Sequence, residues 1–257
     1  MMLFTVIMIF TIITLLATKS NLLQNNSPEK GIKTKNVKEV KTEIGFLSGT
    51  LNITAQDLNK LYSGEYEYQK DEWKPEINYT EQDGTGFLKI ISEDESEEKN
   101  YNSSLNNKWD IKLNKNVKND LFVKMKAGEG KFNLCDSRIN RFNFQMAAGD
   151  IDINLRNTSL QDLNLKAIAG KVSVDLSGQW NNDLHASMTG GAGELVLIIP
   201  ENTGAEIEIT GLLANIYAPD FNKEGHTYTN RAFGKSKYSL YIDVFGGIGD
   251  IELKLIN

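Results

Sequence analysis

The side chains with the clearest potential for chemistry are Asp150 and Asp152, two carboxylates that alternate with apolar residues in the stretch AAGDIDINL. Carboxylates at this spacing project from one face of a β-strand, where paired acids can perform acid–base catalysis on a glycosidic bond. Lys131 precedes Asp152 by 21 residues. Lys171 follows Asp150 at the same interval, so strands stacked at this interval would place opposite charges side by side in a solvated ladder. We therefore predict a structural ladder here and no catalytic residue.

The remaining reactive side chains are few and scattered. His185 occupies an outward position of a predicted strand, His226 lies in a polar stretch with glycine, and the single cysteine, Cys135, follows a strand end. One cysteine excludes an intramolecular disulfide, and two histidines with one thiol are too few for a zinc site. We predict neither a metal nor a cofactor. The net charge of -6, without a basic face, argues against nucleic acid as a partner.

Five aromatic residues ahead of the repetitive part of the chain form a second candidate site. They are Tyr62, Tyr66, Tyr68, Trp73 and Tyr79, within LYSGEYEYQKDEWKPEINY. Such rings could stack on sugars. They could also cover the open end of a sheet, where uncovered strands would pair edge to edge with another chain. We favour the capping role and keep a glycan-binding platform as the alternative.

A repeat positions these side chains. Between residues 121 and 200, four similar blocks carry glycines at a constant step of 21 residues, at Gly128, Gly149, Gly170 and Gly191. Apolar residues alternate with polar ones on both sides of each glycine, a pattern typical of two strands with one face inward. A small residue precedes each glycine, which predicts a tight corner where a stacked backbone leaves no room for a side chain. Close to the C-terminal end of the sequence, Gly247 restores the pattern.

Identical units of strand, corner, strand and turn predict an all-β fold, a parallel β-solenoid of the single-stranded β-helix type with rungs of about 21 residues. An antiparallel β-sandwich is the alternative, because glycine turns also serve hairpins. The constant step favours the solenoid, since a stack requires it and a sandwich does not. The phase of the apolar residues runs back to Gly86 and forward to Leu253, past an insertion at residues 219–239.

The N-terminal part predicts export. Residues 1–17 carry no charge, and their length matches a secretory signal and is short for a membrane span. No Lys or Arg precedes this run, so a cleaved signal peptide and an uncleaved signal-anchor both stay open for residues 1–20. Residues 21–41 are polar and lysine-rich and predict a linker. We then expect an N-terminal capping region at 42–108 and a repeat β-solenoid at 109–257, both outside the cytoplasmic membrane.

Several segments together carry a family resemblance. They are the strands from Gly45 to Ile53, the aromatic segment with its Trp-x-Pro-x-x-x-Tyr end, Gly86 to Ile90, the strand at Trp109 and the Ala-Gly repeats. In these segments the chain resembles the toast-rack family, which is related to the C-terminal domain of LiaF-like cell-wall-active antibiotic response proteins. The resemblance implies a right-handed β-solenoid facing outward from a bacterial membrane, without catalytic residues. Some LiaF-like proteins inhibit an envelope-stress sensor, but this sequence has one hydrophobic segment where they have several.

These observations lead to two functional hypotheses. The first is a non-catalytic exported β-solenoid at the bacterial cell envelope, which acts as a scaffold, as an adhesin-like surface or as a partner in the envelope-stress response. Its partner would be a membrane or envelope protein. The second hypothesis is a cell-surface β-helix protein that binds or degrades polysaccharide, with a glycan as its ligand. Loops carry function more often than stacked strands do, so the insertion at residues 219–239 is the candidate interaction loop.

Overall fold

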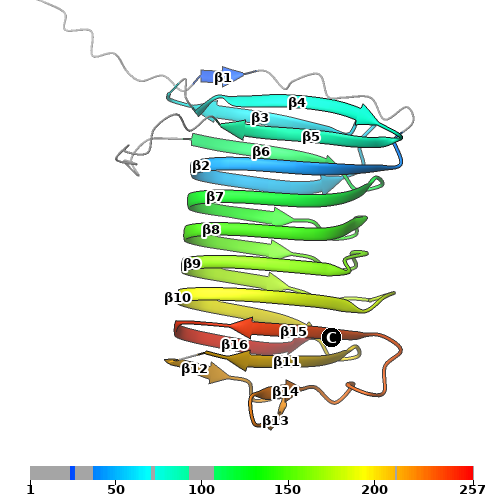
Figure 1. The fold of residues 1–257 in the computed structure, drawn as a ribbon, viewed down its shortest axis with the longest axis vertical. Helices are drawn as coiled ribbons and strands as arrows, with labels where there is room; N and C mark the ends of the chain where they lie inside the picture. The colour runs from blue at the N-terminus through cyan, green and yellow to red at the C-terminus, as the bar shows by residue number, and fades with distance from the viewer. Residues whose placement is uncertain (1–23, 27–36, 71–72, 93–106, 212, 257) are drawn as a thin grey trace, which may run out of the picture.

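The computed structural model describes residues 24–26, 37–70, 73–92, 107–211 and 213–256. They form strands β1 to β16 of one sheet system, with no α-helix among them (Figure 1). Neighbouring strands along the middle of the stack pair in parallel, so the predicted all-β parallel solenoid is confirmed and the antiparallel sandwich is wrong. These ranges contain no helix with the length and apolar character of a membrane span. The predicted signal segment lies outside the described residues.

Four central rungs repeat one shape, a long strand bent near its middle (Figure 1). They are β7 (Lys118–Asn133), β8 (Ile139–Asn154), β9 (Asp162–Asp175) and β10 (Leu184–Pro200). We call the part before the bend the first limb and the part after it the second limb. On β8, buried side chains alternate with outward ones along both limbs, at Phe142, Phe144, Met146, Ile151 and Ile153. This alternation gives each limb one face that packs in the interior of the solenoid.

The bend requires glycine. Gly128, Gly149 and Gly170 pair with one another along the stack and have φ angles of 132°, 143° and 114°, a region that residues with side chains rarely adopt. A Cβ on Gly149 would overlap the carbonyl oxygen of Gly128, and a Cβ on Gly170 would overlap that of Gly149. The corner column therefore leaves no space for a larger residue.

The structure continues this column at Gly193 and Gly249 rather than at the predicted Gly191 and Gly247. The connection between β9 and β10 is longer than the constant step allows, so Gly193 pairs with Gly170 at an offset of 23 residues. A shift of two residues keeps each side chain on its own face of the strand, so the inward residues of β10 remain inward. Gly191 and Gly247 stay at the corner in a second, shorter column.

At the N-terminal end, the rungs do not follow the order of the chain. The first long strand, β2 (Glu39–Gln56), lies between β7 and a rung made of β5 (Thr85–Ser92) and β6 (Asn107–Asn114). β2 begins at Glu39, inside the predicted linker at residues 21–41. Its residue Val40 is already buried in the core. β2 is therefore a complete rung of the solenoid.

The C-terminal end departs from chain order in the same way. The last rung along the chain consists of β15 (Ser239–Phe245) and β16 (Ile248–Ile256). It lies between β10 and a rung made of β11 (Gly204–Thr210) and β12 (Leu213–Tyr217). The first and last rungs of the chain are therefore both flanked by strands on either side (Figure 1).

Short antiparallel strands cover the outer rungs. At the N-terminal end, β3 (Tyr62–Tyr68) pairs with β6, β4 (Pro75–Gln82) pairs with β5, and β1 (Gln24–Asn26) pairs with β3. At the C-terminal end, β14 (Thr227–Thr229) pairs with β11, and β13 (Asn222–Glu224) pairs with β14. Among the described strands, β12 pairs with β16 alone. Both limbs are thus covered at the N-terminal end and one limb at the C-terminal end.

Candidate functional site

The charged residues around Asp150 and Asp152 lie on neighbouring strands in the predicted register. Lys131 stands beside Asp152. Asp150 stands beside Lys171 and accepts a hydrogen bond from its backbone N–H at 3.0 Å. The Lys171 ammonium donates to the Glu194 carboxylate at 2.9 Å, and this hydrogen bond raises the pKa of Lys171. Each carboxylate therefore stands next to a cation on an exposed face, an arrangement that suits a structural ladder.

The two histidines lie on different elements. His185, on β10, stacks on Tyr241 of β15 with ring centroids 5.3 Å apart and an interplanar angle of 11°. Phe233, from the insertion, packs edge-on against Tyr241 at 6.3 Å. His226 is exposed in the turn between β13 and β14. Within the described ranges, no group of three or more His, Cys, Asp and Glu side chains could hold a metal ion.

The insertion at residues 219–239 folds over β11. Its strand β14 pairs with β11, and the buried side chain of Asn230 fixes the segment that follows. The Asn230 side chain donates to the carbonyl oxygens of Pro200 (3.2 Å) and Thr203 (2.8 Å) and accepts from the N–H groups of Ala205 (3.0 Å) and Phe233 (3.1 Å). The insertion is therefore a cap bound to β11.

The predicted aromatic residues lie within the N-terminal cap. Tyr62, Tyr66, Tyr68 and Trp73 are 1%, 3%, 2% and 3% exposed, so their ring faces are not available to stack on a sugar. Tyr79 is partly exposed on β4. Burial, followed by the charge and hydrogen bond of Glu81, raises the pKa of Tyr79. This arrangement supports the capping role over the glycan-binding platform.

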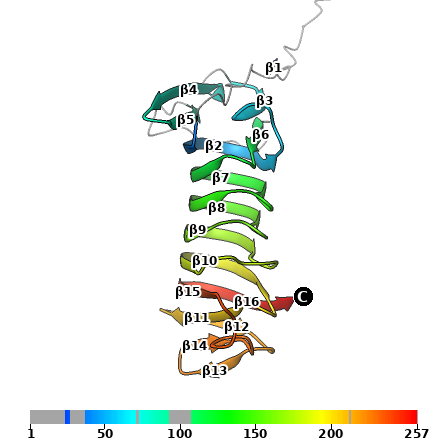
Figure 2. The same ribbon diagram turned by 90° about the vertical axis from the view of Figure 1, so that its right-hand side faces the viewer.

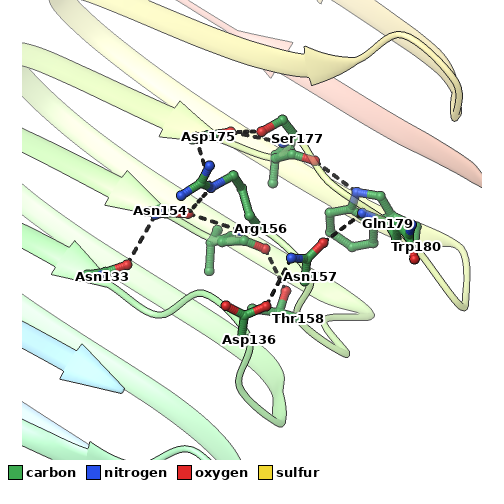
Figure 3. Close-up of polar contacts among 12 residues, drawn as sticks. Asn133, Asp136, Asn154, Arg156, Asn157, Thr158, Asp175, Ser177, Gln179 and Trp180 are labelled. Carbon is green, nitrogen blue, oxygen red and sulfur yellow. Dashed lines mark hydrogen bonds and ion pairs between the residues drawn. The ribbon is translucent and has the colours of Figure 1, made fainter. Parts of the chain in front are cut away.

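The connections between rungs form a further polar face, shown in Figure 3. Asn154 donates to the Asn133 side chain one rung away at 3.1 Å, and Asn157 donates to Asp136 in the same way at 2.9 Å. Cys135 lies beside this ladder. Burial, followed by the neighbouring Asp136, raises the pKa of the Cys135 thiol. A raised pKa lowers the thiolate fraction at neutral pH, so Cys135 is a poor nucleophile.

A groove that no sequence motif marks crosses the outer face of the first limbs near the N-terminal end. Side chains of β4, β5, β2, β7 and β8 line it, and its volume is about 520 Å³. The ladder registers arrange the outward side chains as two adjacent columns. One column is Thr80, Phe87, Lys41, Asp120 and Arg141, and the other is Asn78, Lys89, Glu43, Phe122 and Asn143.

The hollow forms where β4 and β5 leave the line of the stack. Figure 2 shows these two strands extending beyond the face of β2 and β7. Asn78 and Thr80 of β4 therefore form one end of the groove, and Arg141 and Asn143 of β8 form the other end. The N-terminal cap thus shapes a surface on the outer face as well as covering an edge.

Charged side chains of both signs line this groove. The Lys89 ammonium lies 3.6 Å from the Glu43 carboxylate, and the Arg141 guanidinium lies 3.9 Å from the Asp120 carboxylate. Lys41 forms no ion pair with any residue that the structure describes. The lining contains three cationic and two carboxylate side chains, so its net charge is positive on a chain of net charge -6.

Comparison with solved structures finds one protein of similar fold and a second, looser match. A structure from Clostridium sporogenes ATCC 15579, described as "a putative cell adhesion protein", has a TM-score of 0.68 and 26% identity over 91% of this chain and 100% of that chain. "A putative adhesin" from Bacteroides fragilis NCTC 9343 has a TM-score of 0.33 and 15% identity over 90% of this chain and 98% of that chain. The second similarity is too loose to support an argument. No curated protein matches the chain at a significant level.

The sequence also matches a family. The family described as "N-terminal domain of toast_rack, DUF2154" matches residues 22–159 and, a second time, residues 142–198. The two ranges together cover more than half of the chain and include β2, the N-terminal caps and the central rungs. The second match fits a sequence in which similar rungs recur. The chain therefore belongs to the toast-rack family.

Proposed function

We propose that this protein is a non-catalytic adhesion module displayed at the bacterial cell surface. The observation that carries the proposal is the similarity to the Clostridium sporogenes structure, which extends over 91% of this chain at 26% identity. That protein is described as "a putative cell adhesion protein". Because the similarity extends over nearly the whole chain, it concerns the complete fold and not a single motif.

The construction of the stack supports a binding role. Each central strand pairs on both edges, and stacked repeats present long, continuous outer surfaces that other molecules can contact. The acidic residues Asp150 and Asp152 stand beside lysines in the exposed ladder, and we assign them a structural role. The uncharged run at residues 1–17 supports export.

Surface labelling tests display. Intact cells that produce the full chain are treated with a membrane-impermeant biotin reagent, which modifies exposed lysines. We expect the protein to be labelled on intact cells to the same extent as after the cells are broken. Labelling that occurs only after breakage would show that the protein is not displayed, and the cell-surface role would be wrong.

Cell retention tests adhesion. Cells that produce the full chain are washed over immobilised bacterial envelope, and the retained cells are counted. We expect stronger retention than with cells that lack the chain. Cells that produce Gly149→Val, in which the corner column cannot stack, are the control for folding and should be retained no better than cells without the chain. Equal retention with and without the correctly folded protein would contradict the adhesion role.

A further inference from the structure

The groove across β4, β5, β2, β7 and β8 has the properties of a ligand site. Its volume of about 520 Å³ lies within the range of small-molecule sites. Outward side chains form most of its surface, because β5, β2, β7 and β8 beneath it are paired on both edges. Among the described strands β4, at one end of the groove, pairs with β5 alone. Between β5 and β8 a peptide strand cannot add to the sheet, and recognition there must occur through side chains.

Two phenylalanines occupy diagonally opposite places in this groove. Phe87 of β5 is 39% exposed, and Phe122 of β7 is partly exposed. They are two strands and two residues apart, which separates them by roughly 12 Å. Exposed aromatic rings on a polar outer face lose contact with water when an apolar surface covers them. The apolar faces of sugar rings in a short oligosaccharide can cover both rings at this separation.

Polar side chains surround the two rings. Asn78 and Thr80 lie at one end of the groove and Asn143 at the other. Amide and hydroxyl groups donate and accept hydrogen bonds, which suits a ligand with many hydroxyl groups. The combination of exposed rings with amide and hydroxyl groups favours a saccharide over an acidic peptide.

The charge of the groove selects among saccharides. The Lys41 ammonium lies in the middle of its column, 5.8 Å from the centre of the Phe87 ring. Its neighbour on β7 is Asp120, whose carboxylate pairs with Arg141, and Lys41 itself forms no ion pair with a described residue. Lys89 and Arg141 also line the groove, and each lies near a carboxylate. Lys41 is therefore the cation that remains available to an anionic group on a ligand seated against Phe87.

We propose that this groove binds an anionic polysaccharide, with sugar rings on Phe87 and Phe122 and an acidic group of the polysaccharide at Lys41. This inference rests on the proposed adhesion function, since it supplies the ligand class through which the module would adhere. Carboxylate and sulfate groups both carry the negative charge that Lys41 would bind. Separate polysaccharide probes therefore test the two groups.

Calorimetric titration tests the proposal with the full chain in detergent. The carboxylate probe is polygalacturonate, the sulfate probe is dextran sulfate, and the neutral probe is dextran. We expect one of the two anionic probes to bind and dextran not to bind. Binding should weaken as salt is raised, because exposed charges are screened. Binding of neither anionic probe, or equal binding of dextran, would overturn the proposal.

Two pairs of variants locate the binding. Lys41→Glu and Phe87→Ala should each weaken binding of the anionic probe by about tenfold or more, which corresponds to about 1.4 kcal/mol. The matched controls are Lys166→Glu on the exposed outer face of β9 and Phe245→Ala near the other end of the stack, and both should bind as the wild type does. Circular dichroism confirms folding. If Phe87→Ala does not fold, the exposed Lys41→Glu carries the test alone.

Further outcomes distinguish the groove from its alternatives. Tighter binding of poly-glutamate than of either anionic polysaccharide would assign the groove to an acidic protein segment and would overturn the saccharide. Full binding by Lys41→Glu and Phe87→Ala would place the polysaccharide elsewhere and would also overturn it. Cell retention without any polysaccharide binding would overturn the groove ligand and leave the adhesion role intact. Polysaccharide binding without cell retention would contradict the adhesion role alone.

Discussion

The two ends of the solenoid cover their outer rungs by different means. At the N-terminal end, aromatic packing dominates: Trp109 is fully buried between Phe46 and Tyr66, with ring centroids at 5.1 Å and 5.5 Å. At the C-terminal end, one buried polar side chain, Asn230, makes four hydrogen bonds to backbone groups, three of which join the cap to the chain from Pro200 to Ala205 and one of which lies within the cap, at Phe233. The N-terminal cap also covers both limbs, whereas the C-terminal cap covers one.

This difference shows that an edge can be covered by apolar burial or by satisfied polar groups. Burial of aromatic rings is non-directional and contributes a large free energy. A buried amide contributes less, but it fixes the geometry of the segments it joins, because each unmade hydrogen bond is costly. We therefore expect the N-terminal end to depend on side-chain volume and the C-terminal end on hydrogen-bonding groups.

The largest loss of stability is expected from a change in the corner column of glycines, because both caps depend on the same stack of rungs. Gly149→Val places a side chain against the Gly128 carbonyl at a φ of 143°, so overlap adds to backbone strain, and it should destabilise the protein by about 5 kcal/mol or more. The free energy of unfolding in denaturant measures it. The control is Gly190→Ala, where a Cβ meets nothing within 4 Å, and its effect should stay within about 0.5 kcal/mol. Equal melting of Gly149→Val and wild type would contradict the stacked corner.

Removal of the N-terminal ring is expected to have the next largest effect. Trp109→Ala leaves a cavity between Phe46 and Tyr66 and should cost about 3–5 kcal/mol of unfolding free energy. Tyr228→Ala, in the short strand β14 of the C-terminal cap, should cost less, because Tyr228 packs at the very end of the stack. A larger loss for Tyr228→Ala than for Trp109→Ala would reverse the proposed difference between the ends.

Removal of the C-terminal amide should have a smaller and more local effect. Asn230→Ala leaves two N–H groups and two carbonyl oxygens without their partner, and we expect a loss of about 2–3 kcal/mol. Hydrogen exchange at the Ala205 amide should accelerate more than exchange at the amides of β8. Asn230→Asp keeps the acceptor but loses both donors, and should protect Ala205 better than Asn230→Ala. Uniform acceleration along the whole stack would contradict a local role.

The smallest effect is expected from alkaline pH at the N-terminal cap. Burial, followed by Glu81, raises the pKa of Tyr79 above the ordinary value of 10.0. The folded state therefore retains this proton more strongly than the unfolded state, so the contribution to stability is complete below the ordinary pKa and is lost as pH rises through the folded pKa. The difference in alkaline absorbance titration between wild type and Tyr79→Phe measures the pKa. A value at or below 10.0 would contradict this prediction.

The sequence predicts the stack well because the relevant signals are local. Alternation of apolar residues identifies the inward faces, and the 21-residue step places Lys131 beside Asp152 and Asp150 beside Lys171. The step misplaces the fourth glycine of the column because the connection with Trp180 is longer. Strand alternation has a period of two, so a two-residue shift leaves no mark on the pattern of inward residues.

The spatial order of the outer rungs and the groove could not be predicted in this way. Every rung has the same alternation of inward apolar residues. By this pattern β2 could pair equally well with β5, β6 or β7, so the pattern does not choose among them. The groove combines outward residues from five strands that are distant in sequence, such as Lys41, Phe87 and Phe122. Each of these residues taken singly is an ordinary outward side chain of a strand.

The position of β2 and β16 within the stack determines how the protein responds to tension. A pull on the chain ahead of β1 first acts on the short pairing of β1 with β3 and then on β2, which is hydrogen-bonded to β7 on one edge and to β5 and β6 on the other. A pull on the chain after β16 acts on a strand between β10 and β12. Such a load must shear two ladders at once, whereas an edge strand could be unzipped bond by bond. Apart from the three-residue pairing of β1 with β3, the caps lie outside this path, and we expect forced unfolding, which is governed by the unfolding rate, to be correspondingly slow.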